Sequence, residues 1–82
     1  MSQAMPRYYF DVVDAQGTER DDVGQVLPNL QAARKESLRA LIDIAREQFG
    51  SGRSATLQIN VRTDDNIAVS SDCLQLTRTA IQ

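Results

Sequence analysis

Residues 5–36, MPRYYFDVVDAQGTERDDVGQVLPNLQAARKE, contain the signals that decide the fold of this 82-residue chain. Aromatic and β-branched residues dominate Arg7 to Val13, which predicts a first strand. The following DAQG, residues 14–17, has the composition of a turn. Residues 18–20 are therefore expected to return along the first strand as a short hairpin.

A long helix is predicted from Leu30 to Phe49, after an extended segment at residues 25–27. Asn29 is the candidate N-cap, and Gly50 is expected to end the helix in the left-handed conformation. At 100° per residue, one broad side of the helix is expected to dock on a sheet. This side contains Leu30, Ser37, Leu38, Leu41, Ile42, Ile44, Ala45 and Phe49.

The C-terminal part of the chain predicts a second hairpin. Residues 56–62 alternate apolar and polar side chains, residues 63–66 form a turn, and Ile67 and Val69 are the expected inward pair of the next strand. Later leucines are out of phase with that pair, which predicts a bulge or a break within residues 70–73.

The predicted order is β-β-α-β-β, an α+β fold. We expect a mainly antiparallel sheet of three or four strands with one long helix packed on one face. Residues 1–4 are expected to be a loose tail, and residues 5–82 a single small domain. The other face of the sheet is then partly open, and its candidate interface residues are Tyr9, Val13 and Ala68.

The composition argues against an enzyme. The chain contains no histidine and a single cysteine, Cys73, so no nucleophile–base pair and no Cys/His zinc site can be assembled. Asp21, Asp22 and Gly24 resemble part of a calcium loop but lack its further oxygen ligands, so a polar turn is the plainer interpretation. We expect no catalytic residue, no metal site and no cofactor.

Cysteine usage and hydropathy bear on the compartment. One cysteine cannot form an internal disulfide, and neither a signal-peptide core nor a run of about 20 apolar residues is present. The expectation is a cytoplasmic protein without membrane contact.

Three motifs together carry a resemblance to a known family. They are MPRYYF at residues 5–10, DDVG at 21–24 and LPNLQAAR at 27–34. The chain resembles a family of short bacterial proteins, a domain of unknown function, with such an aromatic strand, an Asp-rich turn ending in Gly and an LPxLxxAR-like helix start. Asn29 stands where an acidic cap is commoner, and the residues after Ser70 match poorly. The resemblance implies the fold and a bacterial cytosolic setting, and it brings no catalytic or binding residue.

Arg34 is expected to lie on or near the buried side of the first helical turn, beside Leu30 and Leu38. A charge in that position needs a partner. The nearest preceding acids are Asp21 and Asp22, so we predict an Arg34–Asp22 or Arg34–Asp21 ion pair that holds the loop against the helix.

Lys35, Arg39 and Arg46 form a basic stripe on the outer side of the helix and are the candidate phosphate contacts. Acidic residues at helix-neighbour spacing partly neutralise the stripe, and the formal net charge is −2. Nucleic acid is therefore the less favoured partner. The sequence favours a small non-catalytic interaction or accessory module, as a homodimer or with another protein. The alternative is a weak nucleic-acid-binding or regulatory factor.

Overall fold

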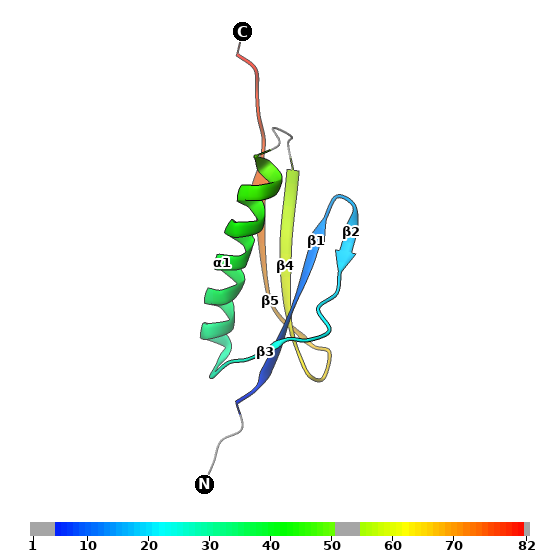
Figure 1. The fold of residues 1–82 in the computed structure, drawn as a ribbon, viewed down its shortest axis with the longest axis vertical. Coiled ribbons are helices and arrows are strands. Elements are labelled where there is room, and N and C mark those ends of the chain that lie inside the picture. Colours follow the sequence, from blue (N-terminus) through cyan, green and yellow to red (C-terminus); the bar gives the residue numbers. More distant parts are fainter. Residues whose placement is uncertain (1–4, 51–54, 82) are drawn as a thin grey trace.

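The computed structural model describes residues 5–50 and 55–81. Its elements along the chain are β1 (Arg7–Asp14), β2 (Gly17–Glu19), β3 (Gln25–Val26), α1 (Leu30–Phe49), β4 (Ala55–Thr63) and β5 (Ala68–Leu76). Figure 1 shows one long helix beside a sheet. The expected tail at residues 1–4 lies outside the described residues.

The strands form one antiparallel sheet in the order β2-β1-β4-β5, with β3 also paired to β1. The predicted α+β class and antiparallel sheet are confirmed. The sheet has five strands rather than three or four, because β2 and β3 pair separately with successive parts of β1. The hairpin between β1 and β2 has the predicted place, with Asp14 opposite Gly17.

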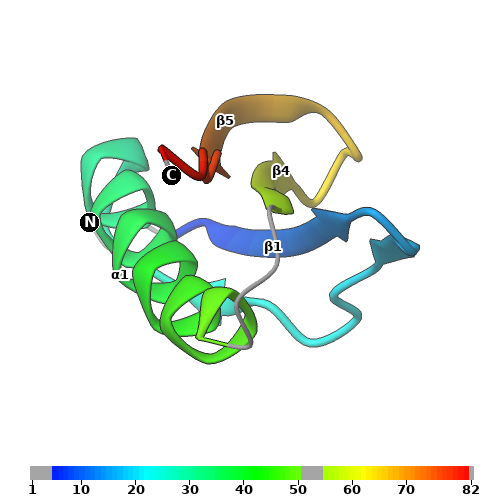
Figure 2. The ribbon, with the colours of Figure 1, turned by 90° about the horizontal axis from the view of Figure 1, so that it is seen from above.

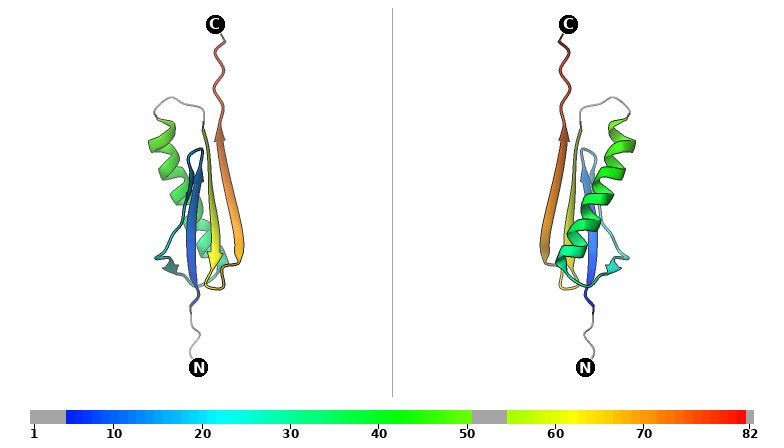
Figure 3. Two further views of the ribbon diagram at one scale, coloured as in Figure 1. Left: turned by 90° about the vertical axis from the view of Figure 1, so that its right-hand side faces the viewer. Right: turned by 90° about the vertical axis from the view of Figure 1, so that its left-hand side faces the viewer.

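The helix covers one face of the sheet, and the other face is open. Figure 2 shows α1 on one side of β1, β4 and β5, and Figure 3 shows it crossing the sheet diagonally. The core lies between α1 and the central strand β4, whose Leu57, Ile59 and Val61 are fully buried. Tyr8 of β1 packs with Ala33 and Val61 in a second buried cluster, and Phe10 contacts both clusters.

The buried stripe of the helix is narrower than expected. It consists of Ala33, Ser37, Leu41 and Ala45, at a spacing of four residues. A stripe of this spacing drifts by about 40° at each step relative to a fixed 100° wheel, as the diagonal crossing requires. Leu30, Leu38 and Ile42 were expected to dock but are exposed, because the drifting stripe leaves them on the flank of the helix.

The predicted N-cap of the helix is confirmed, whereas the predicted C-cap conformation is not. The Asn29 side chain accepts a hydrogen bond from the Ala32 backbone N–H at 2.8 Å, which confirms the predicted N-cap. Gly50 does end the helix, but in the right-handed conformation, at φ −62°. The expected left-handed cap is therefore wrong, and the Gly50 N–H bonds the Gln48 carbonyl instead.

The last strand is longer than the sequence suggested. β5 runs without a break to Leu76. Its β-bulge lies between Ala68, which pairs with Arg62, and Ser70, which pairs with Val61. The bulge is one residue before the segment in which it was expected. The extra residue shifts the phase of the strand, so Leu74 and Leu76 face the same side as Leu57. Ile67 was expected to be buried, yet it is 55% exposed. No helix in the described part of the chain is long and apolar enough to cross a membrane.

Candidate functional site

The open face of the sheet carries a buried ion pair between β1 and β4. Arg62 Nε donates to Asp11 Oδ2 at 2.8 Å, and the two side chains are only 11% and 13% exposed. The pairing register brings them together, since Asp11 lies opposite Asn60 and Arg62 lies opposite Tyr9. The Arg62 guanidinium also stacks 4.6 Å from the centre of the Tyr9 ring.

This ion pair holds the loop between β2 and β3. Arg62 Nη2 donates to the Asp21 carbonyl at 2.7 Å, and the Asp21 backbone N–H donates to Asp11 Oδ1 at 2.9 Å. Both charged side chains therefore have a second contact, on the same loop residue. The arrangement is a structural clamp, because both Asp11 oxygens and two of the Arg62 nitrogens bond within the fold.

The Asp21 carboxylate completes the edge of β1 where neither β2 nor β3 reaches. It accepts hydrogen bonds from the backbone N–H groups of Phe10, Val23 and Gly24 at 3.0, 3.0 and 3.1 Å. Burial by itself would raise the pKa of Asp21. The three N–H donors and the nearby Arg62 outweigh burial, so the pKa lies below its ordinary value.

Tyr9 is engaged at both ends of its side chain. Its ring lies under Arg62, and its hydroxyl donates to Asp64 Oδ1 at 2.9 Å. The hydrogen bond to Asp64 raises the pKa of Tyr9 above the ordinary value of 10.0, with smaller contributions from desolvation and from the Asp64 charge. Asp64, which was expected to be only a turn residue, anchors the tyrosine.

The three candidate interface residues lie on the open face, as their alternation predicts. Tyr9 and Ala68 flank Arg62 in one row across the sheet, and Val13 is opposite Gln58. Polar side chains occupy the space between them. Gln58 Nε2 donates to Asn60 Oδ1 at 2.9 Å and to Ser71 Oγ at 2.8 Å, and Ser71 Oγ donates to Asn60 Oδ1 at 2.7 Å. The open face is thus largely a satisfied polar surface.

Arg34 does not hold the loop. It is exposed, and the ion pairs between described residues are Arg39–Glu36, Arg46–Asp43 and Arg62–Asp11. Neither the expected Arg34–Asp22 pair nor the alternative Arg34–Asp21 pair is among them, because the drifting buried stripe leaves Arg34 on the helix flank. The sequence interpretation missed Arg62. The available signal was its outward position in β4, matched by the outward Asp11 in β1.

The basic stripe is exposed and partly neutralised. Arg39 lies 3.4 Å from Glu36, and Arg46 lies 3.8 Å from Asp43. Lys35 is exposed on the same outer side of the helix. The arrangement leaves little concentrated positive charge for a phosphate backbone.

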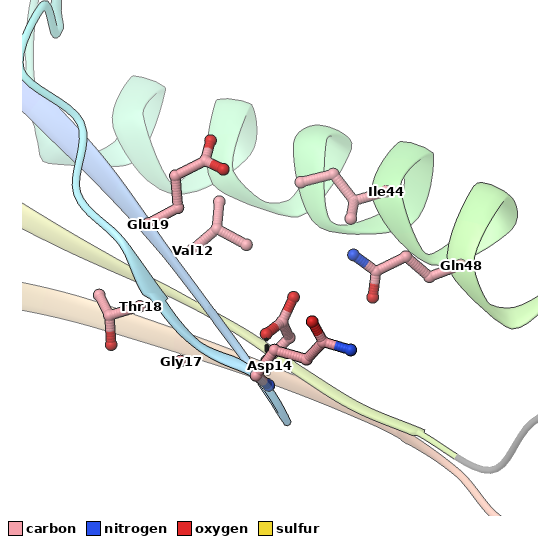
Figure 4. A pocket seen from close by; sticks show the side chains of 8 residues that line it. Val12, Asp14, Gly17, Thr18, Glu19, Ile44 and Gln48 are labelled. Atoms are coloured by element: carbon pink, nitrogen blue, oxygen red, sulfur yellow. Dashed lines mark hydrogen bonds between the residues drawn. The ribbon is translucent and has the colours of Figure 1, made fainter.

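A shallow hollow lies between the β1–β2 hairpin and the C-terminal half of the helix (Figure 4). Its volume is about 420 Å³. It is lined by Val12, Asp14, Gln16, Gly17, Thr18, Glu19, Ile44 and Gln48. Asp14 Oδ1 is already used, as it accepts from the Gln16 backbone N–H at 2.8 Å. Among the described residues, no three His, Cys, Asp or Glu side chains are grouped as metal ligands.

The outer edge of β5 has no partner strand within residues 5–50 and 55–81. Two contacts show which residues of β4 direct their backbone N–H and C=O groups toward β5. Thr63 N–H donates to the Ile67 carbonyl in the hairpin. Phe10 N–H points away from β4 to Asp21, so its opposite residue Val61 directs its own backbone groups toward β5. Alternate residues of a strand direct their backbone groups to opposite sides. The odd-numbered residues of β4 therefore bond β5. Asp72, the partner of Ile59, therefore directs its backbone N–H and C=O groups toward β4. The backbone groups of Ser71, Cys73 and Gln75 point away from the sheet.

We call these outward backbone groups of Ser71, Cys73 and Gln75 the free edge. Among the described elements, none runs along it in either view of Figure 3. The strand carries neither proline nor lysine, two of the features with which proteins often protect such an edge, and its bulge lies near its start.

The comparisons with known proteins identify a family without assigning a chemistry. No curated protein matches the chain, and no solved structure matches it. One family model, described as Domain of unknown function (DUF6894), matches residues 7–71, from the start of β1 into the first half of β5. The matched segment contains the whole clamp of Asp11, Asp21 and Arg62 and most of the core. The chain therefore belongs to the DUF6894 family.

Proposed function

We propose that the protein is a small non-catalytic interaction module that binds a protein partner by accepting a strand along the free edge of β5. The observation that carries this proposal is the row of backbone groups on Ser71, Cys73 and Gln75, which no other strand of the described part of the chain pairs. An added strand gains main-chain hydrogen bonds there, which is a recurrent mode of peptide and protein recognition. The setting that we propose is the bacterial cytosol, supported by the sequence resemblance and the single cysteine.

The free edge is a better candidate surface than the open face. Tyr9 was the expected anchor of the open face, but it is already stacked on Arg62 and bonded to Asp64. A partner on that face would have to compete with these contacts. The free edge requires no rearrangement, because its N–H and C=O groups already point outward.

The alternative function, a weak nucleic-acid binder, has less support. Arg39 and Arg46 each lie beside an acid on the helix, and the chain carries a formal net charge of −2. Retention on a nucleic-acid column that falls steeply with salt would favour this alternative over ours.

The test removes one N–H from the free edge without changing its neighbours. Cys73→Pro deletes an outward donor, whereas the matched control Cys73→Ala keeps it. Native mass spectrometry of gently purified wild-type protein is expected to show a homodimer or a complex with a defined second protein. Cys73→Pro should abolish that complex and Cys73→Ala should retain it, with both variants folded by circular dichroism. A strictly monomeric wild-type protein, or a complex insensitive to Cys73→Pro, would overturn the proposal.

A further inference from the structure

We propose that the strand accepted by the free edge is β5 of a second copy of this chain, in one defined register. This inference rests on the proposed function and names its partner. The two β5 strands run antiparallel about a twofold axis at Gln75, so that residue 75 lies opposite residue 75 of the other copy. Each β5 then pairs with the other copy's residues 77–80 as well as with its β5.

The geometry of the edge restricts which registers are possible. In an antiparallel pair of strands, two residues that lie opposite each other have the same backbone orientation. Either both direct their N–H and C=O groups toward the other strand, or both direct them away from it. Since Ser71, Cys73 and Gln75 point outward, odd residues must lie opposite odd residues. Even residues, whose side chains lie on the helix face, must then lie opposite even ones. This rule leaves a short series of registers, each shifted by two residues.

Asp72 selects one member of the series. Its side chain lies on the helix face, opposite Ile59, and its Oδ2 atom is buried without a hydrogen-bond donor among the described residues. A buried carboxylate oxygen needs a donor, and a cation is the most favourable one. A strand that lies next to Asp72 should therefore present a basic residue directly opposite it.

Only one register of the series supplies that residue. A twofold axis at position 72 places Asp72 opposite Asp72 of the second copy. An axis at 73 places Asp72 opposite Leu74, and an axis at 74 places it opposite Leu76. An axis at 75 sets Asp72 against Arg78 of the second copy, twice per dimer, and an axis at 76 sets it against Ala80. Charge complementarity thus points to the axis at Gln75.

The same register also brings exposed apolar side chains of the two copies together and pairs the segment after β5. Leu74, which is 36% exposed, lies opposite Leu76 of the other copy on the helix face. Residues 77–81 continue from the end of β5 away from the sheet, as Figures 1 and 3 show. Paired with the second copy, most of this segment extends the shared sheet. Leu38 and Ile42, 52% and 46% exposed on the helix flank, would lie beside the added strand.

The interface is small. A strand pair with a few helix residues is below the roughly 20–30 residues a side of a standard interface. We therefore expect a dissociation constant on the order of micromolar. Sedimentation equilibrium over a range of protein concentrations measures it directly.

A charge swap tests the partner of Asp72. Arg78→Asp changes an exposed residue beyond the end of β5 and, with its fold checked by circular dichroism, it should weaken the dimer by at least about tenfold because both copies lose their pair. Asp72→Arg should weaken it similarly. The double variant Asp72→Arg with Arg78→Asp should restore affinity to within about threefold of wild type. Lys35→Asp, the matched charge change outside the interface, should have no effect.

Disulfide trapping tests the register independently. Cys73 lies opposite Thr77 of the other copy, at a Cα–Cα distance of about 5.5 Å, inside the range of about 4.4–6.8 Å that a disulfide needs. Under mild oxidation Thr77→Cys should form a covalent dimer linked through residues 73 and 77. Thr77→Cys with Cys73→Ala should not. A direct Cys73–Cys73 bond in the wild-type protein would indicate an axis at 73 and overturn the register.

The outcomes separate this inference from the proposed function. A complex with a different protein that is lost in Cys73→Pro, without any homodimer, overturns the self-pairing and keeps the interaction module. A homodimer whose affinity is unchanged by Arg78→Asp overturns the register. A protein that forms no complex overturns both.

Discussion

Replacing Arg62 with leucine is expected to be among the most damaging single changes outside the apolar core. The substitution removes the Arg62–Asp11 ion pair, whose side chains are 11% and 13% exposed, and leaves the Asp11 carboxylate with only the Asp21 N–H. Breaking a buried pair by removing one partner costs about 3–5 kcal/mol. The low end applies here, because the loop at residues 20–24 can open and admit water to Asp11.

A loss of about 3 kcal/mol is large for this protein. An 82-residue domain has a total unfolding free energy of about 4–12 kcal/mol. The expected fall in melting temperature is about 12–24 °C, taking about 4–8 °C for each kcal/mol in a domain of this size. Urea unfolding followed by circular dichroism gives the difference in unfolding free energy between wild type and variant. Thermal unfolding gives the fall in melting temperature.

Two further variants make the Arg62 experiment specific. Arg39→Leu removes an exposed ion pair with Glu36 and should cost no more than about 0.5 kcal/mol. Asp11→Leu combined with Arg62→Leu removes the stranded carboxylate and should be more stable than Arg62→Leu alone. The reasoning is refuted if Arg62→Leu is no more destabilising than Arg39→Leu.

Further predictions concern the loop, the helix cap and the open face. Gly24→Ala should cost over about 1 kcal/mol in urea unfolding, because φ is +72° and a Cβ would lie 2.8 Å from a backbone oxygen; an unchanged midpoint would contradict this. Asn29→Ala should cost about 1 kcal/mol by loss of its cap, with Asn29→Asp as the control that retains it. Since the folded pKa of Asp21 is lowered, its stabilisation is complete above the unfolded value near 3.8 and is lost as pH falls through the folded pKa; Asp21→Asn should flatten acid unfolding in that range. Asp64→Asn should lower the pKa of Tyr9 toward 10.0 in an NMR titration, and no change would show that the hydrogen bond does not cause the shift.

Local signals predicted the elements whose causes are local. The helix has the predicted bounds, because good helix formers lie between a capping Asn29 and a terminating Gly50. β4 follows its strict alternation, and Leu57, Ile59 and Val61 are buried as expected. In these segments the side-chain pattern and the backbone preference agree, so one sequence is sufficient to assign them.

The contacts that were missed depend on tertiary geometry. Arg62 and Asp11 are 51 residues apart, and only the pairing register of β1 and β4 brings them together. The choice of Arg34 as the loop partner assumed a fixed helical wheel, whereas the diagonal crossing moves the buried stripe to Ala33 and Ser37. The bulge before Ser70 changes which face every later side chain of β5 occupies, and it places Leu74 and Leu76 on the same side as Leu57. Ile67 precedes the bulge and lies at the hairpin, where it is exposed.

The Asp21 carboxylate has a consequence for how far this protein can assemble. By bonding Phe10 N–H between β2 and β3, it closes the part of the β1 edge that the two short strands leave uncovered. At the opposite edge of the sheet, the described strands that present an outer side are β2 and β3, of three and two residues, and such short segments are poor templates for another strand. Growth into a filament requires two receptive edges on each subunit. A subunit with one receptive edge stops growth after a single addition, so concentrated solutions of this protein should contain closed assemblies rather than fibres.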